Sequence, residues 1–167
     1  MTEPQRREFT FTRTICACDE CKTYCAHLSG MVAPWDLLRW EQAQHDGFAP
    51  WMLSMFAASP GAKVVYQGDV LRIPTIVPAR LLMDGQCVFL TAEHQCRIHT
   101  TAPYGCAYFD HSQSREEGNQ RSQIALAAIL YDWHTQGPYS TWWLQLEQAG
   151  KIVEAPETVR RHMAEEG

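Results

Sequence analysis

Four cysteines fall within ten positions near the start of the chain, in the stretch CACDECKTYCAH at residues 16–27. Cys16, Cys18, Cys21 and Cys25 follow the pattern Cys-x-Cys-x2-Cys-x3-Cys. Thiolates at this spacing can converge on one centre with only local turning of the backbone. Soft sulfur ligands select zinc, copper(I) or iron–sulfur clusters over calcium or magnesium. We therefore interpret this segment as a metal-binding loop.

Three further cysteines follow at wider spacings: Cys87, Cys96 and Cys106. His94 and His99 flank Cys96, and His27 lies two residues after the first cluster, so these histidines are candidate additional ligands. Spacing alone leaves the distal cysteines as either ligands or small core residues. Seven sulfurs could form a four-cysteine site and a three-cysteine site completed by a histidine, a water or a substrate. They could also share bridging sulfurs in a binuclear cluster.

The segment FDHS at residues 109–112 places an aspartate, a histidine and a serine side by side. Adjacent residues do not point together as the members of a catalytic triad must, so we interpret Asp110, His111 and Ser112 as a chance arrangement. The sequence also contains no Gly-rich phosphate loop and no Gly-x-Ser-x-Gly. The usual signatures of a nucleotide site and of a serine hydrolase are therefore missing.

The composition is that of one soluble domain, with 167 residues of which 46% are hydrophobic and 20% charged. The formal net charge of −5 and the lack of a long Lys/Arg run argue against nucleic acid as the main partner. The longest apolar runs are too short to span a membrane. The first fifteen residues lack the apolar core of a secretory signal, so we expect a cytoplasmic protein. Thiols stay reduced there, and clustered cysteines then bind metal more often than they form disulfides.

Hydrophobic periodicity predicts two short helices after the cysteine cluster. The first follows Pro34 and ends at Gly47. The second begins at Pro50, where a proline suits the first turn, and ends at the Ser-Pro-Gly breaker at residues 59–61. These helices would supply apolar faces for a core.

The middle of the chain changes to β-branched residues, which predict strands. A two-residue turn at Gly68-Asp69 predicts a hairpin, and Pro74 and Pro78 restrict its returning strand to a short or edge position. A second turn signal at residues 84–85 precedes the segment that carries Cys87. The later segment around Cys96 could pair with it, which would place both cysteines on or beside a small sheet.

The last third returns to helical patterns. A buried helix is predicted from Asn119 to the stop at Gly137-Pro138, followed by a helix that Gly150 caps. A polar helix opened by Pro156 would complete the chain. The sequence thus predicts an α+β fold, a mostly helical small domain with a short central β-hairpin sheet. We expect residues 1–167 to form a single domain, with a metal-binding core at residues 14–110 and a helical C-terminal part at residues 119–167.

Together these residues resemble the YkgJ-type cysteine-cluster family, also known as the CxxCxxCC or zinc- or iron-chelating domain. Its members carry a clump of four cysteines, a proline with a short helix, and then Cys-x-Phe-Leu, Cys-x-Ile-Tyr and Arg-Pro-x-x-Cys. The counterparts here are the cluster at 16–25, Pro34 with WDLLRW, CVFL at 87–90, CRIH at 96–99 and APYGCAYF at 102–109. The resemblance covers residues 14–110.

The resemblance implies that the metal ligands are Cys16, Cys18, Cys21, Cys25, Cys87, Cys96 and Cys106. The implied metal is zinc or iron, the iron as a single ion or as an iron–sulfur cluster. We interpret the chain as a metal-binding protein of unassigned biochemical role. The competing hypothesis is a metal- or cluster-dependent enzyme that uses an open coordination position for redox or group-transfer chemistry. A third hypothesis is a thiol sensor whose cysteines form disulfides without metal.

Overall fold

The computed structural model describes residues 18–27, 30–154 and 159–163. Its elements, in chain order, are α1 (Asp19–His27), α2 (Pro34–Gln44), η2 (His45–Gly47), α3 (Phe48–Met55), β1 (Phe56–Ser59), β2 (Lys63–Tyr66), β3 (Asp69–Arg72), β4 (Thr75–Pro78), η3 (His99–Thr101), α4 (Tyr104–Ala107), α5 (Arg115–Thr135), α6 (Pro138–Gln148) and β5 (Val159–Met163). Helices and short strands mix in this order, which confirms the predicted α+β class. None of the described helices is long and apolar enough to cross a membrane.

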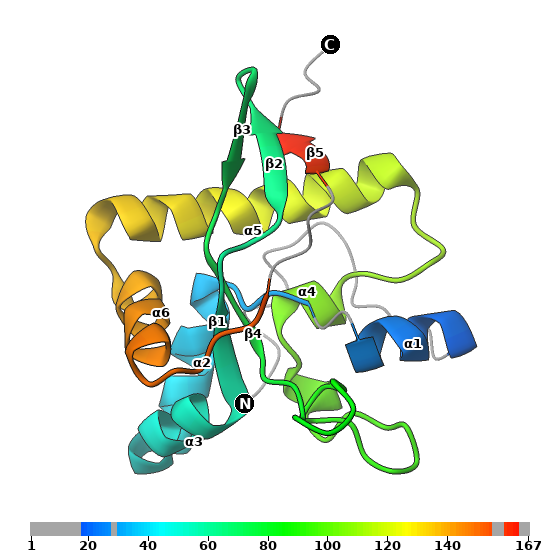
Figure 1. Ribbon diagram of the computed structural model, residues 1–167, viewed down its shortest axis with the longest axis vertical. Coiled ribbons are helices and arrows are strands. Elements are labelled where there is room, and N and C mark those ends of the chain that lie inside the picture. Colours follow the sequence, from blue (N-terminus) through cyan, green and yellow to red (C-terminus); the bar gives the residue numbers. More distant parts are fainter. Residues whose placement is uncertain (1–17, 28–29, 155–158, 164–167) are drawn as a thin grey trace.

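The strands form two small sheets (Figure 1). β1 pairs antiparallel with β4, while β2 pairs antiparallel with β3 and parallel with β5. The predicted hairpin is confirmed, although its turn lies at Gln67 and Gly68, one residue earlier than predicted. Both turn residues have positive φ angles, 49° and 84°, as a tight hairpin turn of type I′ requires. The returning strand, β3, is short as predicted and ends at Arg72, before Pro74. Residues 75–78 form a separate strand, β4, which the sequence did not predict.

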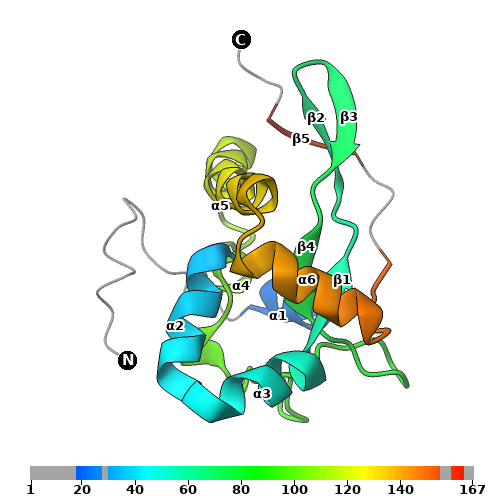
Figure 2. The ribbon, with the colours of Figure 1, turned by 90° about the vertical axis from the view of Figure 1, so that its left-hand side faces the viewer.

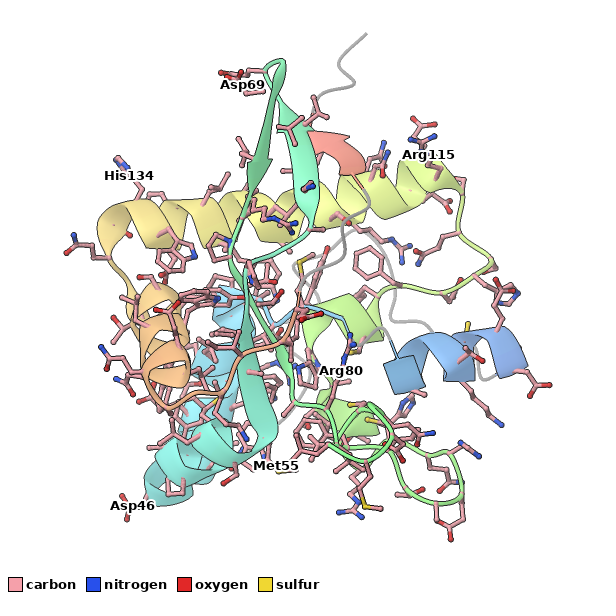
Figure 3. The ribbon with its side chains drawn as sticks, in the orientation of Figure 1. Asp46, Met55, Asp69, Arg80, Arg115 and His134 are labelled. Atoms are coloured by element: carbon pink, nitrogen blue, oxygen red, sulfur yellow. The ribbon has the colours of Figure 1, made fainter. Side chains whose placement is uncertain are left out.

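The helices surround the two-stranded sheet (Figure 2). α6 packs on β1, and α5 packs on α6 and approaches α2. Fully buried side chains from four elements fill the space between them, among them Met52, Phe56, Ile76, Tyr139 and Leu146. α5 crosses the molecule beside the strands, with Arg115 at one end and His134 near the other (Figure 3).

Two hydrogen-bonded polar side chains connect the helices to the segments that carry cysteines. The carboxylate of Asp36, 2% exposed, accepts bonds from the guanidinium of Arg39 and from the backbone N–H groups of Ala33 and Tyr104. The hydroxyl of Tyr139 donates to the carbonyl of Val32 and accepts from the N–H of Ile76. Burial raises the pKa of the Tyr139 hydroxyl, so it keeps the proton that it donates.

Several predicted elements differ from the structure, and the first is the cysteine segment. It is not a loop: residues 19–27 form α1. The Lys22 N–H donates to the Cys18 carbonyl, and two acidic residues in the first turn complement the helix dipole. α1 has few apolar residues, so its sequence shows no hydrophobic periodicity from which a helix could be predicted.

The predicted end of one further helix is wrong, and so is the prediction of another helix. The helix after Pro50 ends at Met55, because residues 56–59 form the buried strand β1; a short apolar run cannot be assigned to helix or strand by periodicity alone. The helix predicted after Pro156 is replaced by β5, which pairs with β2. In both cases tertiary pairing overrides local propensity.

The predicted long helix and its Gly150-capped successor are confirmed as α5 and α6. α5 is buried on one side only, however, since Ile124 and Tyr131 are exposed. The buried side includes the polar residue Asp132, whose carboxylate accepts the N–H groups of Tyr139 and Ser140 and thereby caps α6. The second predicted hairpin is reduced to single bridges, Arg80 with Cys87 and Leu90 with Cys96.

Candidate metal centre

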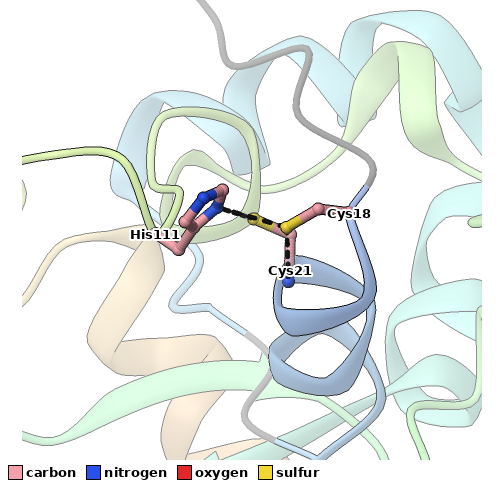
Figure 4. Close-up of side chains that lie close together, drawn as sticks. All are labelled: Cys18, Cys21 and His111. Atoms are coloured by element: carbon pink, nitrogen blue, oxygen red, sulfur yellow. Dashed lines mark hydrogen bonds between the residues drawn. The ribbon is translucent and has the colours of Figure 1, made fainter.

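Two cysteines and one histidine converge beside the start of α1 (Figure 4). The Nδ1 atom of His111 lies 3.2 Å from the Cys18 sulfur and 3.3 Å from the Cys21 sulfur. The three potential ligand atoms all lie within 4.8 Å of one another. Over the described ranges, this is the one set of three or more Cys, His, Asp or Glu side chains arranged closely enough to hold a metal ion.

Helix α1 positions the two thiols. Cys18 directly precedes the helix and Cys21 lies in its first turn, so their spacing of three residues brings the side chains to the same face. The Cys21 N–H points to the Cys18 sulfur at 3.5 Å. A sulfur that accepts a backbone N–H is stabilised in its charged thiolate form, which is the form that binds metal.

A tight turn positions His111. The N–H and the hydroxyl of Ser112 both donate to Asp110 Oδ1, at 2.9 and 2.6 Å, so the residues on either side of the histidine fold the backbone into a turn. Ser114 then begins α5 with a capping box, in which its side chain and that of Glu117 bond to each other's backbone N–H. The turn and the helix start together fix the backbone from which His111 extends.

The interpretation of FDHS as a chance arrangement therefore missed a role. Asp110, His111 and Ser112 do not form a triad, but the outer two residues shape the turn that presents the middle one. Two of the candidate histidines, His94 and His99, are exposed and lie outside the cluster. The side chain of His27 lies outside the described part. A signal was present in the sequence, since an Asx-type Asp-x-Ser turn before a Ser-x-x-Glu capping box marks a fixed position.

The donor set suits a thiophilic metal. Two sulfurs bound to the same tetrahedral zinc lie about 3.8 Å apart, because each Zn–S bond is about 2.3 Å. The observed separations are compatible with this value after small side-chain rotations. The two thiols are half-buried and the imidazole is exposed, so the centre lies at the surface of the domain.

One of the distal cysteines, Cys87, lies on a segment that bonds to the C-terminal end of α1. Cys87 is buried, and its N–H donates to the carbonyl of Ala26. Cys96 is half-buried in a bridge with Leu90. The three distal sulfurs do not form a cluster as tight as that of Cys18, Cys21 and His111. Of the other predicted ligands, Cys16 and the side chain of Cys25 lie outside the described residues.

Cys106 is held by a close crossing of two backbone segments. Gly30 and Gly105 approach so closely that a Cβ atom on either would overlap the backbone of the other. This contact allows the Gly30 N–H to donate to the Cys106 sulfur at 3.2 Å. The two glycines therefore bring the segment after α1 against the segment that carries Cys106.

The fold and the site define a small α+β domain with a cysteine–histidine cluster. Comparison with known families matches residues 17–125 to CxxCxxCC, described as "Putative zinc- or iron-chelating domain". The match covers well over half of the chain, and the chain belongs to this family. Neither the curated proteins nor the solved structures gave a match.

Proposed function

We propose that this chain is a zinc-binding protein in which Cys16, Cys18, Cys21 and His111 hold one metal ion. The observation that carries the proposal is the convergence of His111 on two thiols that lie 90 or more residues away in the sequence. Three thiolates and one imidazole are one of the donor sets of structural zinc sites. The metal would tie α1 to the turn between α4 and α5.

The helix geometry favours Cys16 over Cys25 as the fourth ligand. At about 1.5 Å per residue, the seven steps from Cys18, directly before α1, to Cys25 rise about 10 Å along the helix axis. A disulfide joins Cα atoms at most about 6.8 Å apart through sulfurs about 2 Å apart. Widening the sulfur separation to the 3.8 Å or so of a shared zinc extends this reach to about 8.6 Å. Cys18 and Cys25 therefore belong to different centres, while Cys16 is two residues from Cys18.

The imidazole also favours zinc over an iron–sulfur cluster. Such clusters are held by four cysteine thiolates in most proteins, and the histidine-bound type uses two imidazoles. A mixed set with a single histidine is common for zinc, which accepts nitrogen and sulfur equally in a tetrahedral site.

Metal content and thermal stability test the proposal. Protein purified without oxygen should be colourless and contain zinc in stoichiometric amount. A strong chelator at neutral pH should lower Tm by about 10 °C or more, because a structural metal binds the folded chain and not the unfolded one. Added zinc should restore the original Tm. The proposal is contradicted if the purified protein lacks metal or if the chelator leaves Tm unchanged. A brown protein that contains iron and sulfide would show that the bound group is an iron–sulfur cluster and not zinc.

The remaining predicted ligands, Cys25, Cys87, Cys96 and Cys106, would form a second set of four. Two backbone contacts support it: the Cys87 N–H bonds to the residue after Cys25, and the Cys106 sulfur accepts an N–H bond, as metal-bound thiolates commonly do. We expect Cys96→Ser to lower the metal content by about one ion per chain. Elemental analysis of parent and variant measures this, and equal metal content would remove the distal cysteines from the ligand set.

A further inference from the structure

We propose that Cys18 and Cys21 are a site of reversible oxidation, at which a disulfide forms and the metal is released. The inference rests on the metal centre proposed above and adds that oxidation of these two cysteines determines whether the centre holds its metal. It concerns the same two sulfurs, which cannot serve as thiolate ligands and as a disulfide at the same time.

The geometry places the two sulfurs within 4.8 Å of each other on one side of α1. Both contact the same atom, His111 Nδ1, at 3.2 and 3.3 Å. A disulfide needs an S–S distance of about 2 Å and Cα atoms about 4.4–6.8 Å apart, which residues three apart at the start of a helix satisfy. Cys18 precedes the first helical residue, so its side chain can rotate without breaking a turn of α1.

The site is open to small oxidants. The Cys18 and Cys21 side chains are half-buried, and the imidazole that contacts both is exposed. Cys87, in contrast, is only 5% exposed. Oxidation by a molecule in solution should therefore reach the pair before it reaches Cys87.

The reaction balances with hydrogen peroxide as the oxidant. One thiolate attacks a peroxide oxygen, the O–O bond breaks, and the departing hydroxide takes a proton to become water. The resulting sulfenic acid is attacked at sulfur by the second thiolate, which forms the S–S bond and expels a second hydroxide, again protonated to water. The two sulfurs lose two electrons in total, and the peroxide gains them. Disulfide sulfurs carry no charge, so the metal loses two of its anionic ligands and dissociates.

The test uses the zinc-loaded full chain, treated with hydrogen peroxide in the presence of a coloured zinc indicator. Zinc release should coincide with the loss of two hydrogens from one tryptic peptide. Trypsin cleaves after Arg13 and Lys22, so residues 14–22 carry the pair while Cys25 falls in the next peptide. A thiol reductant should restore both the peptide mass and the bound zinc. His134→Ala, at the far end of α5 and outside both ligand sets, should release zinc as the parent does.

Two variants test whether the disulfide joins Cys18 to Cys21 and not another pair of cysteines. Cys16→Ser should still lose the two hydrogens, because the pair is intact, whereas Cys21→Ser should not. If Cys16→Ser abolishes the loss, or if oxidation links residues 14–22 to the peptide that holds Cys25, the assignment to Cys18 and Cys21 is wrong. If zinc is bound but peroxide neither releases it nor oxidises the pair, this inference fails and the proposed function stands. If the disulfide forms in a chain that never held metal, the release step fails together with the proposed function.

Discussion

Replacing Asp36 by alanine is expected to lower the free energy of unfolding by about 3–5 kcal/mol, the usual effect of removing one partner of a buried ion pair. The Asp36 and Arg39 side chains are 2% and 8% exposed, with a nitrogen–oxygen distance of 2.8 Å. Without the carboxylate, the guanidinium keeps the carbonyls of Thr101 and Ala102 and the ring of Trp40 but no counter-charge. The N–H groups of Ala33 and Tyr104 lose their acceptor. Urea unfolding followed by circular dichroism measures the change.

A double-mutant cycle separates the charge from the backbone bonds. In an Arg39→Met background, Asp36→Ala no longer leaves a buried guanidinium unpaired, so its effect on the free energy of unfolding should be smaller than in the parent by the cost of that unpaired charge. The coupling energy between the two positions should then exceed about 1 kcal/mol. Equal effects of Asp36→Ala in both backgrounds would show that the ion pair does not determine the stability of this region.

The largest expected effect on the metal centre is that of His111→Ala, which should weaken zinc binding there by more than about 100-fold. Removing a group that merely orients a ligand already costs about 10- to 100-fold, and here a ligand itself is lost. Because the His111 side chain is exposed, the substitution should leave the packed core intact. Competition with a chromophoric chelator of known affinity measures the change.

Two further histidine variants control this experiment. His134→Ala should bind zinc as the parent does, since His134 is near the far end of α5 (Figure 3). His111→Cys should restore much of the affinity, because a thiolate replaces the imidazole in a tetrahedral site. Rescue by cysteine distinguishes a ligand from a residue that only maintains the turn. Parent-like zinc affinity in His111→Ala would remove His111 from the centre.

The sequence predicted the fold class, the hairpin and the helices that carry regular apolar patterns. It failed where structure depends on contacts rather than on periodicity. α1 has no apolar stripe, and β1 is buried by pairing with β4, so neither had a distinctive local pattern. α5 has apolar residues on several sides, so hydrophobicity alone does not identify its buried face. The buried face includes Asp132, whose carboxylate caps α6.

The cysteines could be proposed as ligands because their type and spacing carry the chemistry, while His111 could not. His94 and His99 were candidates because they flank Cys96 in the sequence, but the fold brings His111 to Cys18 and Cys21. Proximity in the sequence is a poor guide to ligands that come from distant segments. The buried pair of Asp36 and Arg39 was missed for a related reason, since charged residues on a short helix are expected to face solvent.

The long separation between Cys18 and His111 has a consequence for how the chain matures. A metal that joins residues 93 apart would close a long loop, and closing such a loop costs an unfolded chain about 4–5 kcal/mol of conformational entropy, so the last ligand should bind only once the domain has folded. Synthesis proceeds from the N-terminus, so Cys18 and Cys21 leave the ribosome before His111 has been added to the chain. Metal captured early by the cysteines would acquire its last ligand only when the chain beyond α4 has been made and has folded back onto α1. Completion of the centre would then mark a finished domain, and scarcity of the metal would appear first as a failure of newly made chains to mature.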